Sequence, residues 1–516
     1  MASYMTYGAH QGWLFLHILT MVIAWVGIMP IAVMFFIAGS RLHLPAQLLF
    51  LIVNAVGIVF STIYNSLTPD LYPGNSHHKL GWALVWILGA QAVLGVLSST
   101  ICGLTPSRYS SREERAGFMP VPLYSPVTDD EEYRNSRDSG HGSSIHRESD
   151  EEDLDIETHE WTRGPVRSKT KAHRGWFKAE KLEKLLQKHA PFVFNDRVVA
   201  GCDFFYSLIA RFLIPLAFVQ LSLGIVTASG IFMGDRVFNG LAHFIKGGIF
   251  LMYGIFTLGR FLGAFSDLGW AWNLPSTQSK KYRPSAETVE SGLIFFYGCS
   301  NVFLEHLAGW GKAWTHSDLQ HASIAFMFFG GGLCGLLIES KKIRSLLNPS
   351  SSPPSSTSPS EKPTTEGKHR IPINPLPALI IFLLGILMSQ HHQHSAFSTM
   401  IHTQWGALLA GAAVFRLFTY MAFWHSSTPP DVNPSRPPTE LVAAFALIAG
   451  GAVFMISNKD TVNYLEKIGV DAMFSLTVVV GCTALLMSWV VVVMAVKGWA
   501  AKRELPPRRT DEMERV

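Results

Sequence analysis

The feature that most constrains this chain is a series of apolar stretches, most of them about twenty residues long. A helix of that length crosses the hydrocarbon core of a bilayer, where only helices and closed barrels satisfy every backbone hydrogen bond. The pattern therefore predicts an all-α, polytopic transmembrane helical protein with about eleven spans. We expect these spans at residues 12–37, 46–66, 79–101, 203–232, 239–263, 288–308, 318–339, 375–390, 398–424, 439–456 and 471–496.

The chain has few charged residues, and two polar segments interrupt its apolar series. Only 16% of the residues are charged, against about a quarter in soluble proteins, so the bilayer itself is the first partner that the sequence indicates. Two polar segments interrupt the apolar series, a mixed-charge stretch at 104–200 and a Ser/Pro-rich linker at 345–371. Both compositions are typical of disorder.

The distribution of Lys and Arg predicts the orientation, because cytosolic loops carry an excess of these residues. With the N-terminus outside, the basic residues gather in the cytosolic connections and in the tail at 499–516. The C-terminus and both polar segments are then cytosolic. The basic residues follow this rule and form no separate patch, so we expect no nucleic-acid partner. Secretory, vacuolar and plasma membranes all remain compatible with an integral, multi-pass protein.

Two histidines stand at the expected outer ends of different spans. His17 lies near the outer end of the first span, and His77 precedes the third span at the same side. Neutral imidazoles that face each other between helices can hold a haem iron from both sides. The alternative is that each ring only donates a hydrogen bond to a neighbouring helix.

The segments around these histidines add a resemblance to a known family. HILTMVIAWVGIMP (17–30) and HHKLG (77–81), the latter followed by Gln91 and Gly95, resemble the first and third core helices of the cytochrome b561 superfamily. In that family four helices bind two b haems, and helices one and three supply one pair of histidines. The resemblance implies that His17 and His77 are haem ligands, with His78 as the adjacent alternative.

The second ligand pair of that family is missing here. Alignment of the second span places Phe50 at the ligand position, and alignment of the fourth places Tyr206 or Ser207 there. The resemblance therefore implies that one haem is retained on the non-cytosolic side and that the inner one is lost.

The remainder of the chain resembles a second family. GLAHFIKGGIFLMYGIFTLGRFLGAFSDLGWAWN (240–273) and SQHHQHSAFSTMIHTQWG (389–406) are similar to fungal membrane proteins of the Ytp type, in which a cytochrome b561-like domain precedes the Ytp-like one. The implied organisation is three bundle helices at 1–103, the cytosolic loop at 104–200, the fourth bundle helix at 201–235, and a Ytp-like domain in two halves, 236–344 and 372–498, joined by the linker.

Further imidazoles and carboxylates gather at the expected outer ends of the later spans. Such side chains suit zinc, copper or iron, so the pattern predicts a metal site, and the alternative is a set of interfacial polar groups. The candidate metal ligands are His243, Glu305, His306, Asp318, His321, His391, His392 and His402.

Charges inside the expected spans carry a separate prediction. Arg211, Lys246, Arg260 and Arg416 each require a charged partner or a water-filled cavity at that depth. The sequence does not say which partner belongs to which cation.

Three classes of function are compatible with these features. The first is a redox or metal-handling membrane protein, which as an enzyme would be a haem-dependent oxidoreductase that exchanges electrons with a small reductant or a metal ion at the outer face. The second is a transporter or channel-like protein without haem, and the third is a non-catalytic membrane scaffold. No cytosolic partner of the 104–200 loop is indicated.

Overall fold

The computed structural model describes residues 3–104, 196–272, 284–304, 311, 313–347, 373–390, 393–425 and 435–504. The chain divides into two compact units, Met1–Val93 with Phe204–Val516 and Leu94–Asp203. The first unit holds all of the packing considered below. The second contains the end of one helix and the start of the next. The expected disorder at 104–200 and 345–371 falls almost wholly outside the described residues.

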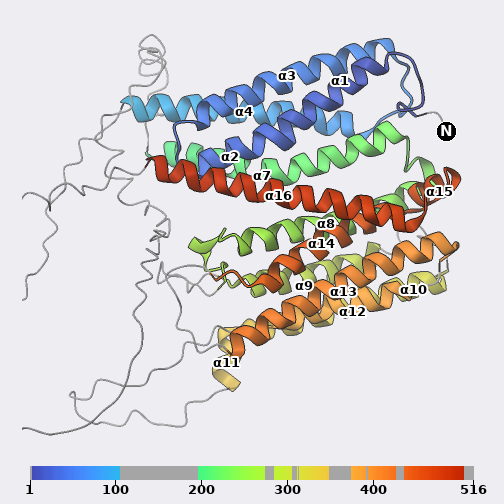
Figure 1. Ribbon diagram of the computed structural model, residues 1–516. Coiled ribbons are helices and arrows are strands. Elements are labelled where there is room, and N and C mark those ends of the chain that lie inside the picture. Colours follow the sequence, from blue (N-terminus) through green and yellow to red (C-terminus); the bar gives the residue numbers. More distant parts are fainter. Residues whose placement is uncertain are drawn as a thin grey trace, which may run out of the picture. The chain divides into compact units, whose positions relative to one another are not determined.

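The regular structure of the described residues is helical (Figure 1). Every expected span overlaps a helical segment, and eight of the helical segments in the described ranges are long and apolar enough to cross a membrane. The N-terminal helices are α1 (Gln11–Val22), α2 (Met29–Ile37), α3 (His43–Leu67), α4 (Ser76–Leu104) and α7 (Asp196–Ser229). The later ones are α8 (Val237–Phe261), α9 (Ala286–Leu304), α10 (His316–Glu339), α11 (Lys341–Leu347), α12 (Leu376–Ser389), α13 (Ala396–His425), α14 (Pro438–Ile456), α15 (Lys459–Lys467) and α16 (Ala472–Glu504).

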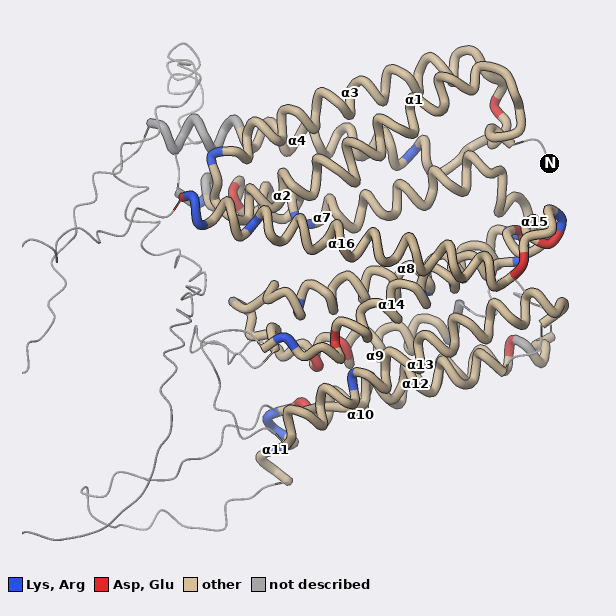
Figure 2. The backbone as a smooth tube through the Cα atoms, viewed as in Figure 1, with Lys and Arg blue, Asp and Glu red and all other residues tan. Residues whose placement is uncertain are grey.

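The surface of these helices is that of a membrane protein. Large apolar side chains point outward in the middle of helices, with Trp86 77%, Phe326 68% and Leu485 74% exposed. Figure 2 shows that most charged residues lie near the helix ends, with long uncharged stretches between them. Apolar surface of this extent is stable only against lipid or another apolar partner.

The first expected span is not one continuous α-helix. A π-helical turn at Ile23–Ile28 separates α1 from α2, directly before Pro30. Proline has no N–H, so the carbonyl of Val26 loses its helical partner. The indole N–H of Trp489, from α16, donates to that carbonyl at 2.9 Å. A residue of the last helix thus satisfies the backbone group that Pro30 frees, as membrane helices require.

Close contacts between small residues position the later helices. A Cβ on Gly247 of α8 would lie 2.6 Å from the carbonyl oxygen of Gly451 on α14. A Cβ on Gly385 of α12 would likewise lie 2.5 Å from the carbonyl oxygen of Gly406 on α13, and a Cβ on Gly406 would lie 2.5 Å from that of Gly385. Small residues allow membrane helices to approach this closely. Neighbouring spans are therefore held near enough for their side chains to pair.

Loops at one end of the helices tie the N-terminal bundle to the later domain. The Tyr72 hydroxyl, just before α4, donates to the carbonyl of Ile231, just before α8, at 2.9 Å. Asp460 of α15 accepts from the backbone N–H of Phe232 at 2.8 Å and pairs with Arg236 at 2.9 Å. Burial, and after it the charge of Asp460, raises the pKa of the Tyr72 phenol. The starts of α4 and α8 therefore lie at the same end.

Candidate functional site

The bundle brings His17 and His77 together at that end. The two ring centres are 6.3 Å apart and the ring planes are inclined by 75°. Nδ1 of His17 lies 2.9 Å from the carbonyl oxygen of Gly57 on α3, and Nδ1 of His77 lies 3.2 Å from that of Gln220 on α7. A carbonyl can only accept, so both rings donate from Nδ1 and keep the lone pair on Nε2. This is the tautomer in which Nε2 binds a metal.

The separation of the rings agrees with two imidazoles on one iron. A metal–nitrogen distance of about 2.0–2.1 Å on each side places the ring centres about 6.4 Å apart. Glycines flank the pair: a Cβ on Gly224 would lie 3.1 Å from Cε1 of His77, and one on Gly57 would lie 2.9 Å from Cε of Met21. The residues present therefore fit a haem iron held between α1 and α4.

His78, the alternative ligand, is placed differently. Its side chain is exposed and lies edge-on to Trp82, with the ring centres 6.4 Å apart. Since only one of two adjacent residues can face the bundle interior, His77 is the one that faces His17.

The residues that the resemblance aligns with a second ligand pair lie toward the other end of the bundle. Phe50 is 2% exposed and packs edge-to-face on Trp25, with the ring centres 5.2 Å apart. The hydroxyl of Tyr206 lies 2.5 Å from Nε2 of His43 and 2.6 Å from Oε1 of Gln47. Packed aromatic rings and this polar cluster fill the region. Sequence reasoning did not select His43 and Gln47, although their spacing of four on one helix places them on one face.

The later domain contains a second pair of histidines. The rings of His243 on α8 and His402 on α13 have centres 6.1 Å apart and are inclined by 86°. Nδ1 of each donates to the carbonyl four residues earlier, that of Asn239 or Ser398, at 2.8 Å. His402 is 4% exposed. The arrangement repeats that of His17 and His77 in a different set of helices.

The other candidate metal ligands have varied positions. His321 of α10 lies within electrostatic range of His243. Asp318 caps its own helix: its carboxylate accepts from the N–H of Thr315 at 3.0 Å, and its N–H donates to the Thr315 hydroxyl at 3.2 Å. Glu305, His306, His391 and His392 lie outside the described residues. Among the residues that are described, no three His, Cys, Asp or Glu side chains form a metal-binding group.

Two of the expected intramembrane cations have carboxylate partners. Arg260 lies 3.3 Å from Glu287 and 3.2 Å from Glu290. Arg416 lies 3.5 Å from Glu290 and 2.6 Å from Glu440. These partners come from α9 and α14, so the ion pairs join four helices. The sequence pointed to both cations and left their partners open.

Trp272 lies beside both of these guanidinium groups. Its ring centre is 4.5 Å from Cζ of Arg260 and 5.3 Å from Cζ of Arg416. Guanidinium groups at such distances are attracted to the face of an aromatic ring. Of the other two expected cations, Arg211 is exposed and donates to Ser207 on its own helix. Lys246 lies within electrostatic range of His243.

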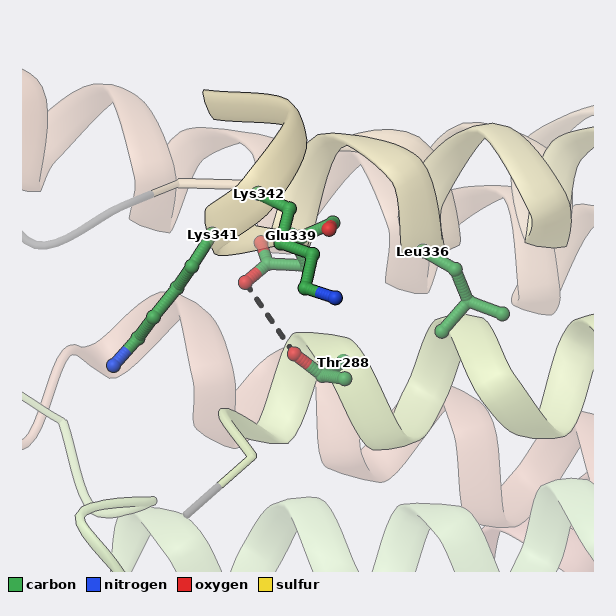
Figure 3. Close-up of a pocket in the computed structure, with 6 residues that line it drawn as sticks. Thr288, Leu336, Glu339, Lys341 and Lys342 are labelled. Carbon is green, nitrogen blue, oxygen red and sulfur yellow. Dashed lines mark hydrogen bonds between the residues drawn. The ribbon is translucent and has the colours of Figure 1, made fainter. Parts of the chain in front are cut away.

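An open pocket of about 500 Å³ lies at the junction of α9, α10 and α11 (Figure 3). Glu339 on its wall accepts from Thr288 at 3.4 Å and from Ser285 at 3.0 Å, and pairs with Arg344 at 3.3 Å. None of the histidines considered above lines this pocket. We assign it no part in the candidate sites.

The chain is similar to two protein families and to several fungal membrane proteins. A family described as "Protein YTP1-like, C-terminal" matches residues 216–498, and a domain of unknown function matches residues 1–101. An uncharacterized membrane protein of Schizosaccharomyces pombe is 36% identical over 96% of this chain and 96% of its own length. Another from Saccharomyces cerevisiae is 43% identical over 55% of this chain and 46% of its own length. Protein YTP1 of Saccharomyces cerevisiae is 23% identical over 49% of this chain and 45% of its own length.

Proposed function

This chain belongs to the YTP1-like family of fungal multi-pass membrane proteins, and we propose that it is a membrane redox protein with one b haem. His17 and His77 are the proposed axial ligands. The observation that carries the proposal is the pairing of two Nδ1-donating imidazoles, 6.3 Å apart, from two different helices.

The residues around the pair define what such a site can do. A haem with two imidazole ligands supplies one-electron transfer. The carbonyls of Gly57 and Gln220 orient the rings and raise the basicity of Nε2. With both imidazoles holding the iron, such a haem would carry electrons and would not bind a substrate. Since the resemblance aligns Phe50, and Tyr206 or Ser207, with a second ligand pair, the electron exchange is proposed to take place at one side, with a small reductant or a metal ion.

The absorption spectrum of the purified protein tests this proposal. We expect a Soret band, with the shift on reduction that six-coordinate b haem shows, in protein purified in detergent from haem-replete cells. The separation of His17 and His77 is also that of an ordinary edge-to-face ring contact. The spectrum therefore distinguishes a haem-binding pair from a simple contact between two rings. A folded, colourless preparation would contradict the proposal and favour the haem-free transporter or scaffold.

The pair His243 and His402 favours a second candidate function, a transition-metal site for zinc, copper or iron. Two imidazoles with their Nε2 atoms free for coordination supply half of a tetrahedral site. His321 is the nearest further candidate, and Glu305, His306, His391 and His392 remain candidates outside the described residues. Such a site would handle metal at the same end of the helices as His17 and His77.

Elemental analysis checks the metal site. His402→Ala is expected to lower the metal bound by the purified protein by at least about tenfold, because loss of even an outer-sphere group costs about 10- to 100-fold in affinity. His316→Ala is the matched control, since His316 is an exposed histidine at the start of α10. Equal metal content in wild type and His402→Ala would remove the site.

A further inference from the structure

A buried ionic network joins four helices of the later domain, away from both histidine pairs. Its members are Arg260 of α8, Glu287 and Glu290 of α9, Arg416 of α13 and Glu440 of α14. Their side chains are 3, 13, 7, 5 and 0% exposed, in that order. The network is therefore almost completely removed from water, in a part of the chain that spans the membrane.

Within the part of the chain that the structure describes, the charges of this network do not balance. Among the described residues, two guanidinium groups face three carboxylates, so full ionisation leaves one negative charge in excess. Tyr253 and Tyr420 lie within electrostatic range of the same groups. On the adjacent α10–α11 corner, Glu339 already pairs with Arg344. The helices α12 and α16, which pack on α13 and α14, carry no charge in their sequences before Lys497.

An excess charge at this depth is costly unless something neutralises it. A proton is the smallest cation that can do so, and it needs no cavity of its own. One of the three carboxylates would then hold the proton.

The distances single out Glu290. Glu440 lies 2.6 Å from Arg416, the short contact that a charged pair makes. Glu287 is the most exposed of the three carboxylates and reaches water most easily. Glu290 contacts both guanidinium groups through one oxygen, Oε1, at the longer distances of 3.2 and 3.5 Å. Its buried Oε2, like both oxygens of Glu440, has no hydrogen-bond partner among the described atoms, so the longer distances are what distinguish Glu290 from Glu440. The guanidinium groups favour the ionised form of this carboxyl, but burial without a close contact favours the neutral form, and of the three carboxyl groups Glu290 is the one where burial is least offset.

We propose that Glu290 is a proton-binding site, with Arg260 and Arg416 holding its carboxyl group and Glu287 connecting it to water. Binding places one proton on a carboxylate oxygen of Glu290, and release returns it to solvent by way of Glu287. The network then alternates between a balanced and a negatively charged state. This inference is independent of haem or metal at the histidine pairs.

The ionic network lies on the same two helices as the second pair of histidines. Arg260 and Arg416 lie on the same two helices as His243 and His402, about 20–25 Å further along them at a rise of about 1.5 Å per residue. One helix pair therefore carries imidazoles near one end and a proton site toward the other. Such an arrangement suits a protein in which proton uptake accompanies electron or metal transfer.

Infrared difference spectroscopy tests the proposal in the full-length protein reconstituted in lipid nanodiscs. Wild type is expected to show a protonated-carboxyl stretching band at neutral pH that shifts in D₂O. The band is expected to disappear in Glu290→Gln and to persist in the matched variants Glu287→Gln and Glu339→Gln. Absence of the band in wild type, its persistence in Glu290→Gln, or its loss in Glu287→Gln instead would overturn the assignment.

Folding of the Glu290 variant supplies a second readout. Glutamine is a neutral isostere of protonated glutamate, so the proposal requires Glu290→Gln to fold and to keep the thermal unfolding midpoint of wild type at neutral pH. A variant that fails to fold, or that unfolds well below wild type, contradicts a neutral Glu290.

Discussion

Replacement of either His17 or His77 by alanine is expected to abolish the Soret absorbance of the purified protein. The two rings come from α1 and α4 and face each other at 6.3 Å, so each variant removes one of two proposed axial ligands. Loss of outer-sphere partners already costs about 10- to 100-fold in metal affinity, and loss of a direct ligand should cost at least as much. The haem content per protein, from the reduced-minus-oxidised spectrum, measures the effect.

Two other histidines serve as controls for this result. His78→Ala removes an exposed ring beside the proposed ligand, and His43→Ala removes the ring that contacts Tyr206 at the other end of the bundle. Both variants should keep the haem. If His43→Ala lost the haem while His17→Ala kept it, the ligand assignment would be wrong, and the site would lie at the opposite end of the bundle.

The second large effect is expected at Glu440. This carboxylate is completely buried and lies 2.6 Å from Arg416. Glu440→Gln leaves a buried guanidinium without its shortest ion pair, and removal of one partner of a buried pair costs about 3–5 kcal/mol. We expect the free energy of unfolding to fall by that amount, measured by denaturant titration in detergent micelles.

The same substitution elsewhere provides the comparison. Glu504 pairs at 3.3 Å with Arg41, whose side chain is 70% exposed. A surface pair contributes about 0–1 kcal/mol, so Glu504→Gln should be nearly neutral. Equal losses in the two variants would mean that the network around Arg416 does not stabilise the fold.

The positions of the membrane spans could be predicted from the sequence, because an apolar run long enough to cross the bilayer must form a helix wherever it packs. The span predicted at 12–37 is confirmed as a helical region, Gln11–Ile37, that is long and apolar enough to cross a membrane. Pro30 interrupts the hydrogen-bond ladder of this region, and the carbonyl of Val26 in the π-turn at Ile23–Ile28 accepts from Trp489, which lies far along the chain. The number of membrane crossings and their orientation stay predictions.

For the candidate sites, the sequence identifies the residues and the packing of the helices brings them together. Residue type and position along the apolar spans are enough to identify His17, His77, His243 and His402 as candidates. Choosing His77 over His78 required the rotation of α4 about its own axis, since adjacent residues differ only in the direction in which they point. Bringing His243 to His402 required α8 and α13 to pack against the same helix, α14, which sequence spacing does not encode.

By itself, the sequence determined that this protein is an all-helical membrane protein and which imidazoles and guanidinium groups lie at membrane depth, because hydropathy and charge act locally along the chain. Only the tertiary structure decided which side chains pair with these groups. Arg260 and Arg416 could each have paired with any nearby carboxylate. Helix contacts at Gly247 and Gly451 set the approach of α8 and α14, and through it which carboxylates reach which guanidinium. Pairing depends on distances between helices, and these follow from packing over the whole domain.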